Sequence, residues 1–219
     1  MDGVYRRQRG GLEEMKVLIL NGSPKKEGNT YTALREMELT LNEQGIDTEL
    51  IHVGNRAIRG CTACGGCAKT GKCVFDDCVN EIGEKFREAD GIVIGSPVYY
   101  ASANATLMAL LQRLFYSTDY SKTMKVGASV VIARRGGLSS TYDELNKFFG
   151  ISGMPIVGGQ YWNSVHGGAP GEAAQDAEGM QGMRTLARNM AFLIKSIALG
   201  KEAYGLPERE KGIYTNFIR

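Results

Sequence analysis

Short apolar runs alternate with amphipathic segments five times along the sequence, and this alternation restricts the fold more than any other feature. The apolar runs predict strands at 17–20, 47–53, 89–96, 125–133 and 154–161. The segments after them predict helices at 31–45, 79–88, 104–117, 139–149 and 176–199. The third run is apolar on both faces, which is typical of a parallel strand covered on both sides. We therefore expect a doubly wound parallel α/β sheet.

The first apolar run leads through a turn, residues 21–28, into a helix that begins near Asn29. This order points several backbone N–H groups and the positive end of a helix at one spot, which suits a phosphate. Ser23, Asn29 and Thr30 add polar donors, and Lys25 adds positive charge. The turn contains neither GxGxxG nor GxxxxGK[ST], so it is neither a dinucleotide fingerprint nor a Walker loop. The alternative is an ordinary strand–helix turn with solvated lysines.

The order of the strands predicts where a ligand binds. Five strands whose first loop lacks the dinucleotide signature fit the order 2-1-3-4-5, in which the ligand lies where the first and third strands part. The loops at 22–30, 97–104 and 134–138 follow the first, third and fourth strands, so we expect them along one rim beside that crevice. The long loop at 54–78 follows the second strand and is expected on the same rim.

Length and charge limit the remaining possibilities. Residues 15–200 are enough for one domain with a full core, between a flexible arm at 1–14 and a tail at 201–219. The chain has 26 basic and 24 acidic residues and no basic stripe, which argues against nucleic-acid binding. No apolar run reaches membrane-spanning length, and the arm lacks the apolar region of a secretory signal.

All five cysteines lie between residues 61 and 78, inside the loop at 54–78. This clustering indicates metal or redox chemistry in a reducing compartment, which we expect to be the cytoplasm, rather than a disulfide framework. Four of them are spaced C-x2-C-x2-C-x5-C, which fits a [4Fe-4S] cluster better than the more widely separated pairs of a zinc site. The alternative is a lid over substrate with reduced cysteines. The four are Cys61, Cys64, Cys67 and Cys73, and Cys78 lies beyond the pattern.

Three motifs together carry a resemblance to a known family. The loops GSPKKEGNT and SPVYYASANA resemble those of the NADPH-dependent FMN reductase branch of the flavodoxin-like superfamily. The segment CTACGGCAKTGKCVFDD resembles the iron-sulfur flavoprotein family within it. The resemblance covers roughly residues 15–195, and it implies FMN as a cofactor and the four spaced cysteines as cluster ligands.

The resemblance also implies how FMN is held. Its phosphate would bind Ser23, Lys25, Asn29 and Thr30, and its ring would lie along Pro97, Val98, Tyr99, Tyr100 and Ala101, flanked by Arg134, Arg135, Gly136 and Gly137. Asn104 would cap the helix after the ring-binding turn. The two tyrosines could instead serve packing, and the arginines could be solvated. No catalytic side chain is expected, since the flavin carries the chemistry.

Three functions remain open at this point. The first is an FMN-dependent oxidoreductase that takes electrons from NAD(P)H and passes them to a quinone, a flavin, oxygen or another small acceptor. The second is an electron carrier with FMN and a cluster, served by a ferredoxin. The third is a non-catalytic flavin-binding module. We expect a homodimer or homotetramer, paired through the helix at 104–117 and the tail. His52 is expected to be structural, whereas His166, near Trp162, could cover the flavin or contact substrate.

Overall fold

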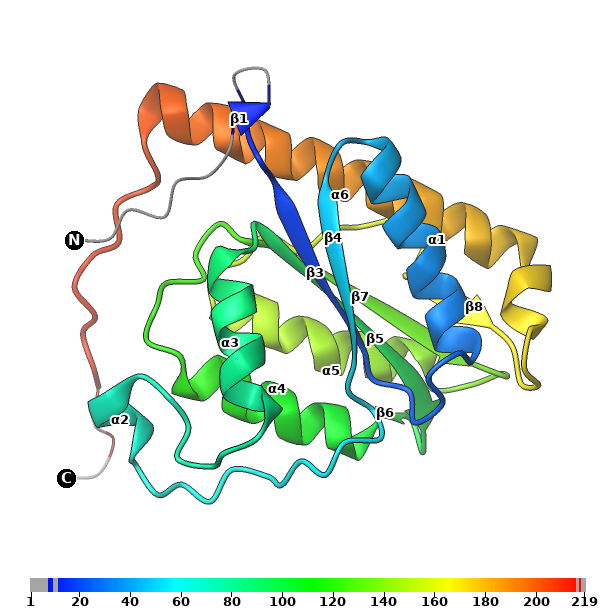
Figure 1. The fold of residues 1–219 in the computed structure, drawn as a ribbon, viewed down its shortest axis with the longest axis horizontal. Coiled ribbons are helices and arrows are strands. Elements are labelled where there is room, and N and C mark those ends of the chain that lie inside the picture. The colour runs from blue at the N-terminus through cyan, green and yellow to red at the C-terminus, as the bar shows by residue number, and fades with distance from the viewer. Residues whose placement is uncertain (1–7, 10–11, 216, 218–219) are drawn as a thin grey trace.

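The computed structural model describes residues 8–9, 12–215 and 217, and within them the main sheet contains five parallel strands (Figure 1). Their spatial order is β4, β3, β5, β7, β8, which is the predicted 2-1-3-4-5 when these strands are numbered along the chain. The flavodoxin-like arrangement is therefore confirmed. The strands are β3 (Lys16–Asn21), β4 (Asp47–His52), β5 (Gly91–Tyr99), β7 (Val126–Ala133) and β8 (Ser164–His166).

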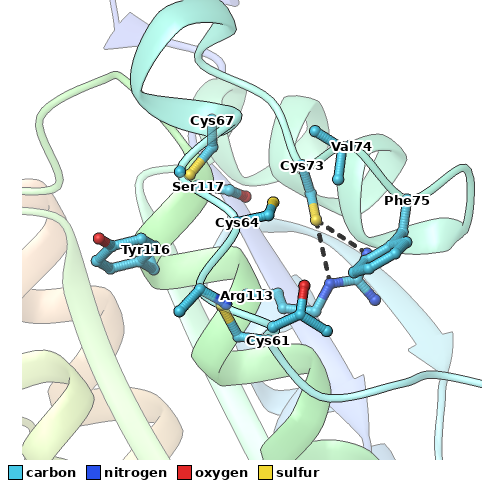
Figure 2. A pocket seen from close by; sticks show the side chains of 12 residues that line it. Cys61, Cys64, Cys67, Cys73, Val74, Phe75, Arg113, Tyr116 and Ser117 are labelled. Atoms are coloured by element: carbon cyan, nitrogen blue, oxygen red, sulfur yellow. Dashed lines mark hydrogen bonds between the residues drawn. The ribbon is translucent and has the colours of Figure 1, made fainter.

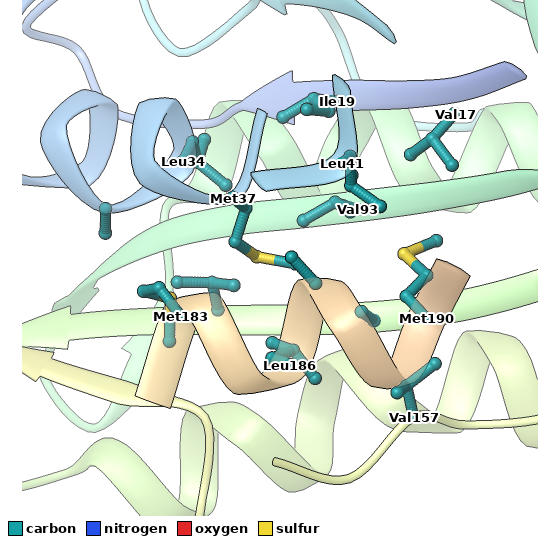
Figure 3. Packing of buried hydrophobic residues seen from close by; sticks show 14 of the residues in the cluster. Val17, Ile19, Leu34, Met37, Leu41, Val93, Val157, Met183, Leu186 and Met190 are labelled. Atoms are coloured by element: carbon teal, nitrogen blue, oxygen red, sulfur yellow. The ribbon is translucent and has the colours of Figure 1, made fainter. Parts of the chain in front are cut away.

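Helices cover both faces of the sheet, because alternate residues of each central strand point to opposite sides. On one face, Val17 and Ile19 pack with α1 (Asn29–Glu43) and α6 (Ala177–Tyr204). Figure 3 shows Met37 and Leu41 of α1 in the same cluster of buried side chains as Met183 and Met190 of α6.

The other face carries the remaining three long helices. Leu18 and Leu20 of β3 pack with α3 (Cys78–Glu88), α4 (Ala105–Ser117) and α5 (Leu138–Ile151). The leucines of α4 are buried in this core, so the apolar character of the helix reflects its own packing and does not by itself indicate the subunit contact that we expected.

The position of the fifth strand was predicted wrongly. The segment at 154–161 makes only an isolated bridge, between Ile156 and Gly127, and the strand itself is β8. The side chain of Asn163 explains the break, because its Oδ1 accepts from the Gly159 N–H at 3.2 Å and its Nδ2 donates to the Val157 carbonyl at 3.3 Å. These bonds close a loop, and the chain rejoins β7 only at Ser164, the first residue of β8.

The remaining differences are at the ends of elements. The segment at 97–103 continues β5 and returns as β6 (Ser102–Ala103), so it is a hairpin rather than an irregular turn. The last helix continues to Tyr204, into the expected tail. In the expected arm, β1 (Gln8–Arg9) pairs with β2 (Leu12–Glu13), and residues 1–7 and 10–11 lie outside the described residues. Within the described ranges, no helix combines the length and apolarity needed to cross a membrane.

Candidate functional site

Asn21, the last residue of β3, shapes the loop that follows it. Its Oδ1 accepts from the Ser23 N–H at 3.0 Å, and its Nδ2 donates to the Lys26 carbonyl at 3.0 Å. Side-chain bonds of this kind substitute for backbone bonds in a turn. The sequence analysis did not assign this role to Asn21, although an asparagine at the end of a strand and before a glycine signals such a turn.

The end of β4 holds the same loop from the side. His52 donates from Nε2 to the Ser23 carbonyl at 2.7 Å, in agreement with its expected structural role. Gly54 approaches so closely that a Cβ there would lie 2.2 Å from the Ser23 oxygen. On the other side, the Gly22 N–H donates to the Gly95 carbonyl at 2.8 Å. The loop is therefore held between the end of β4 and strand β5.

The N-terminus of α1 is arranged to receive an anion. Its N-cap is Gly28, which supplies no side-chain acceptor, and the first turn has no acidic residue. The first N–H groups of a helix lack partners within the helix, so a bound anion can accept their hydrogen bonds. Ser23 and Thr30 are buried beside this end, whereas Lys25 is exposed.

Asn29 has a different set of partners from the one expected. Its Nδ2 donates to the Ala169 carbonyl at 2.9 Å, and its Oδ1 accepts from the Ala173 N–H at 3.2 Å. The side chain thus ties α1 to the segment between β8 and the short helix η1 (Glu172–Gln175). Its contact with a phosphate stays a prediction, and that contact would compete with these two bonds.

The β5–β6 hairpin is the predicted ring-binding turn. Its two loop residues, Tyr100 and Ala101, have φ values of 51° and 60°. Two left-handed residues in a two-residue hairpin form a type I′ turn, which usually contains glycine or asparagine. Pro97 and Val98 are partly buried, whereas Tyr99 is about half exposed and Tyr100 is fully exposed at the tip.

Helix α5 holds this hairpin in place. Glu144 accepts from the Ser102 Oγ and from the Ala103 N–H, each at 2.8 Å, and Ser140 donates to the Ala101 carbonyl at 2.9 Å. At Gly137, where φ is +86°, a Cβ would lie 2.8 Å from the Ala101 Cα. The predicted site residues Gly137 and Ala101 are therefore neighbours. The sequence offered no signal for Ser140 or Glu144.

The other residues after β7 are on the surface of the same rim. Arg134, Arg135 and Gly136 are exposed. The side chain of Arg134 runs beside Gly168, close to Glu172. The N–H groups of Gly168 and Ala169, followed by the charge of Arg134, hold the pKa of Glu172 below its usual value. The loops after β3, β5 and β7 thus meet at one edge of the sheet, as predicted, and their contact with FMN stays a prediction.

Four of the five cysteines line a hollow that is separate from this rim (Figure 2). Cys61, Cys64, Cys67 and Cys73 surround it, whereas Cys78 lies apart on α3. Four thiols with no competing ligand type are the donor set of an iron–sulfur cluster, so the chemistry of the residues fits that group. Among the described residues, however, no three Cys, His, Asp or Glu side chains are gathered as ligands of one metal ion. The hollow between the four cysteines is small, with a volume of about 20 Å³.

The hollow lies away from the expected rim, which corrects one prediction. It is lined by Arg113, Tyr116 and Ser117, in the last turns of α4, whereas the ring-binding hairpin precedes the first turn of the same helix. Arg113 is nine residues beyond Asn104, which spans about 14 Å at 1.5 Å per residue. The loop begins at the rim, but it then runs beside α4 to the short helix α2 (Cys67–Thr70) (Figure 1).

Left-handed backbone lets the cysteine loop turn sharply. Ala63, Gly65 and Gly71 have φ values of 52°, 71° and 67°. A Cβ at Gly71 would lie 2.4 Å from the carboxylate of Asp119, so a larger residue there would displace that side chain. Asn104, at the other end of α4, caps the helix as predicted and accepts from the Thr106 N–H at 2.7 Å.

Cys73 is held more firmly than the other three cysteines that line the hollow. Asn80 of α3 accepts from the Cys73 N–H and donates to the Cys73 carbonyl, both at 2.9 Å. The Sγ of Cys73 accepts from Nε and from Nη2 of Arg113, both at 3.2 Å (Figure 2). Burial opposes the positive charge of Arg113, but hydrogen bonds to Asp77 and Cys73 outweigh it and raise the pKa of the guanidinium.

Another cavity, of about 480 Å³, lies between β8 and the start of α6. Trp162 and His166 line it, and His166 Nδ1 is 3.5 Å from Asp176 Oδ2. Asp176 is also the N-cap of α6, where it accepts from the Gly179 N–H at 2.9 Å. A contact of Trp162 or His166 with flavin or substrate stays a prediction.

Comparison with known proteins places this geometry among flavoproteins. A model of the family described as NADPH-dependent FMN reductase matches residues 15–169. An iron-sulfur flavoprotein of Methanocaldococcus jannaschii is 36% identical over 191 residues, which cover 84% of this chain and 99% of the relative.

Two solved structures share the fold. RosB, solved with bound 8-demethyl-8-formylriboflavin-5′-phosphate, aligns with a TM-score of 0.67 at 18% identity, covering 94% of this chain and 92% of RosB. A flavodoxin from the domain Archaea aligns with a TM-score of 0.56 at 14% identity, covering 83% of this chain and 99% of the flavodoxin.

Proposed function

Because the chain belongs to the NADPH-dependent FMN reductase family, we propose that it is an oxidoreductase that uses FMN together with a [4Fe-4S] cluster. Family membership makes it an FMN-binding flavoprotein of the reductase type. The proposal adds the cluster, and the observation that carries it is the meeting of Cys61, Cys64, Cys67 and Cys73 at one hollow. The name of the Methanocaldococcus jannaschii relative supports the same assignment.

The FMN site in this proposal is the rim formed by three loops. The N-terminus of α1 holds the phosphate, with Ser23 and Thr30 as hydroxyl donors and Lys25 as the nearby charge. The hairpin at 97–101 borders the ring, and α5 keeps that hairpin rigid through Ser140 and Glu144. FMN supplies hydride and single-electron chemistry, and the residues supply binding and orientation.

The proposal also includes the electron donor and the electron acceptor. Arg134 and Arg135 are exposed at the rim, where a nicotinamide dinucleotide would present its phosphates, and this favours NAD(P)H as a donor. A ferredoxin-type protein is the alternative source of electrons if the chain is a pure carrier. In both cases we propose a small organic acceptor or a protein partner, within a reducing compartment such as the cytoplasm. The five free cysteines support that location.

The separation along α4 supports assembly of more than one copy. Within one chain, the cysteine hollow and the ring-binding hairpin are at opposite ends of that helix, about 14 Å or more apart at 1.5 Å per residue. A neighbouring copy that brings its own rim to the hollow would shorten the path for electrons. We therefore keep the homodimer or homotetramer as part of the proposal.

Anaerobic purification with iron, sulfide and flavin analysis tests the proposal. We expect one FMN and about four irons per chain, as a [4Fe-4S] cluster requires. NADPH, NADH and a reduced ferredoxin are then compared as reductants of the bound flavin. FMN without iron would leave a simple reductase, flavin that no donor reduces would leave a binding module, and absence of FMN would contradict the proposal altogether.

A further inference from the structure

One positive charge is buried directly beneath the cysteine hollow. The side chain of Arg113 is only 1% exposed, the largest among the fully buried side chains of the described residues. Taking a guanidinium out of water costs several kcal/mol unless its donors are all used. A buried arginine in an apolar helix therefore needs hydrogen-bond acceptors that offset this desolvation cost.

The guanidinium of Arg113 donates hydrogen bonds both to a carboxylate and to a sulfur. Nη1 and Nη2 donate to the two oxygens of Asp77, at 2.5 and 2.9 Å, and Nη1 also donates to the Arg59 carbonyl at 3.2 Å. Nε and Nη2 both donate to the Cys73 Sγ at 3.2 Å. A planar fork can serve two acceptors in this way, whereas a lysine ammonium cannot.

We propose that Arg113 sets the reduction potential of the cluster by donating two N–H groups to the sulfur of Cys73, an inference that rests on the proposed function. Reduction adds one electron, and therefore one negative charge, to a cluster and its thiolates. N–H donors to a ligand sulfur stabilise the reduced form more than the oxidised form, so they raise the potential. Arg113 acts through Cys73 and is thus a positioning residue.

The hydrogen bonds single out one cysteine among the four. Within the described part of the chain, the Cys61 sulfur accepts only the weaker 3.4 Å bond from the Ala63 N–H in its own turn. Cys73 alone combines a backbone clamped by Asn80 with a buried cation at its sulfur. The effect of Arg113 is therefore expected at one corner of the cluster and not across the whole loop.

Arg113→Lys in the full-length protein tests the inference, with Arg59→Lys as the matched control. Arg59 is exposed, and its guanidinium lies over the Phe75 ring at 4.6 Å, as that of Arg113 does at 5.1 Å. Among the residues that the structure describes, however, it donates no hydrogen bond to a sulfur. The readout is the cluster midpoint from an anaerobic redox titration followed by electron paramagnetic resonance. The FMN midpoint of the same samples is recorded optically.

We expect Arg113→Lys to make cluster reduction about tenfold less favourable, which is a midpoint about 59 mV lower for a one-electron couple. The FMN midpoint and the Arg59→Lys protein should match the wild type. An unchanged cluster midpoint in Arg113→Lys, or an equal shift in Arg59→Lys, would overturn the inference. Wild-type protein without iron would instead contradict the proposed function, so the two failures are distinguishable.

A second variant separates the hydrogen bonds from the charge. Arg113→Met with Asp77→Asn removes both members of the ion pair, so the net charge does not change, and asparagine can still cap α3 as Asp77 does through the Val79 N–H. We expect the midpoint to remain below that of the wild type. If both Arg113 variants lose their iron, the residue holds the cluster rather than setting its potential, and the inference is wrong.

Discussion

The Nε2 atom of His52 lies 2.7 Å from the carbonyl oxygen of Ser23, so the last residue of one strand holds the loop that leaves its neighbour. Strands β3 and β4 pair in parallel with Asn21 opposite His52, so both strands end at the same edge of the sheet. The loop at the N-terminus of α1 is thus supported from outside its own strand.

His52→Leu removes this support without touching the expected ligand atoms. We expect FMN affinity to fall by about 1 kcal/mol, the usual net value of one such hydrogen bond, because the Ser23 backbone is no longer fixed. Titration of the apoprotein with FMN, followed by flavin fluorescence, measures the change, and iron content should stay the same. An unchanged affinity would mean that Asn21 and Gly54 fix the loop without His52.

Ser23→Ala combined with Thr30→Ala tests the phosphate site directly. Both hydroxyls are buried beside the start of α1, and their loss should weaken FMN binding by about 1–3 kcal/mol. The matched control is Thr40→Ala in the same helix, whose hydroxyl donates to the Glu36 carbonyl at 2.9 Å. Calorimetric titration should separate the two proteins, and equal affinities would move the phosphate elsewhere.

Ala101→Gly should stabilise the protein, because the left-handed backbone of this residue suits glycine. Glycine relieves the strain at φ 60° but gives the unfolded chain more conformational freedom. The net effect should be an increase of about 0.5–1 kcal/mol in the free energy of unfolding. Denaturant unfolding measures it. Ala109→Gly, in the middle of α4, should have the opposite sign by about 1 kcal/mol. A loss of stability in both variants would contradict strain in the hairpin.

Glu49 should make the fold sensitive to acid. Hydrogen bonds from Lys16, then from Lys85, lower the pKa of this carboxyl from its usual 4.5. A group whose pKa is lower in the folded state contributes stability above its unfolded pKa, and this is lost as the pH falls through the folded value. Glu49→Gln should therefore be less stable than the wild type at pH 7, and the difference should shrink below pH 4.5. The check is the melting temperature of both proteins measured from pH 7 to below pH 4.5. A difference that stays constant with pH would contradict this prediction.

The sequence predicted the sheet well because each central strand is an apolar run of its own. It failed at the fifth strand, where the apolar run at 154–157 pairs at one residue and Asn163 then closes a loop. That loop depends on a side chain outside the run. Short edge strands have too few residues for a periodic signal to outweigh such local bonds.

The candidate sites were predicted in part, for a similar reason. Spacing identified the four cysteines, because neighbouring thiols in the sequence remain neighbours in space. Arg113 is 40 residues beyond Cys73 and resembles any solvated cation at the end of a helix, so its role depends on tertiary packing alone. The cysteine loop was expected at the rim because it leaves β4 there, but its length carries it along α4.

The position of the cysteine hollow at the far end of α4 makes the two candidate centres structurally modular. The hollow draws its walls from one loop and from the last turns of one helix, whereas the rim uses the loops after β3, β5 and β7. A change in the cysteine loop can therefore leave the rim as it is. The same sheet could gain, exchange or lose its cysteine loop during evolution, or in a designed chimaera, while it retained its rim.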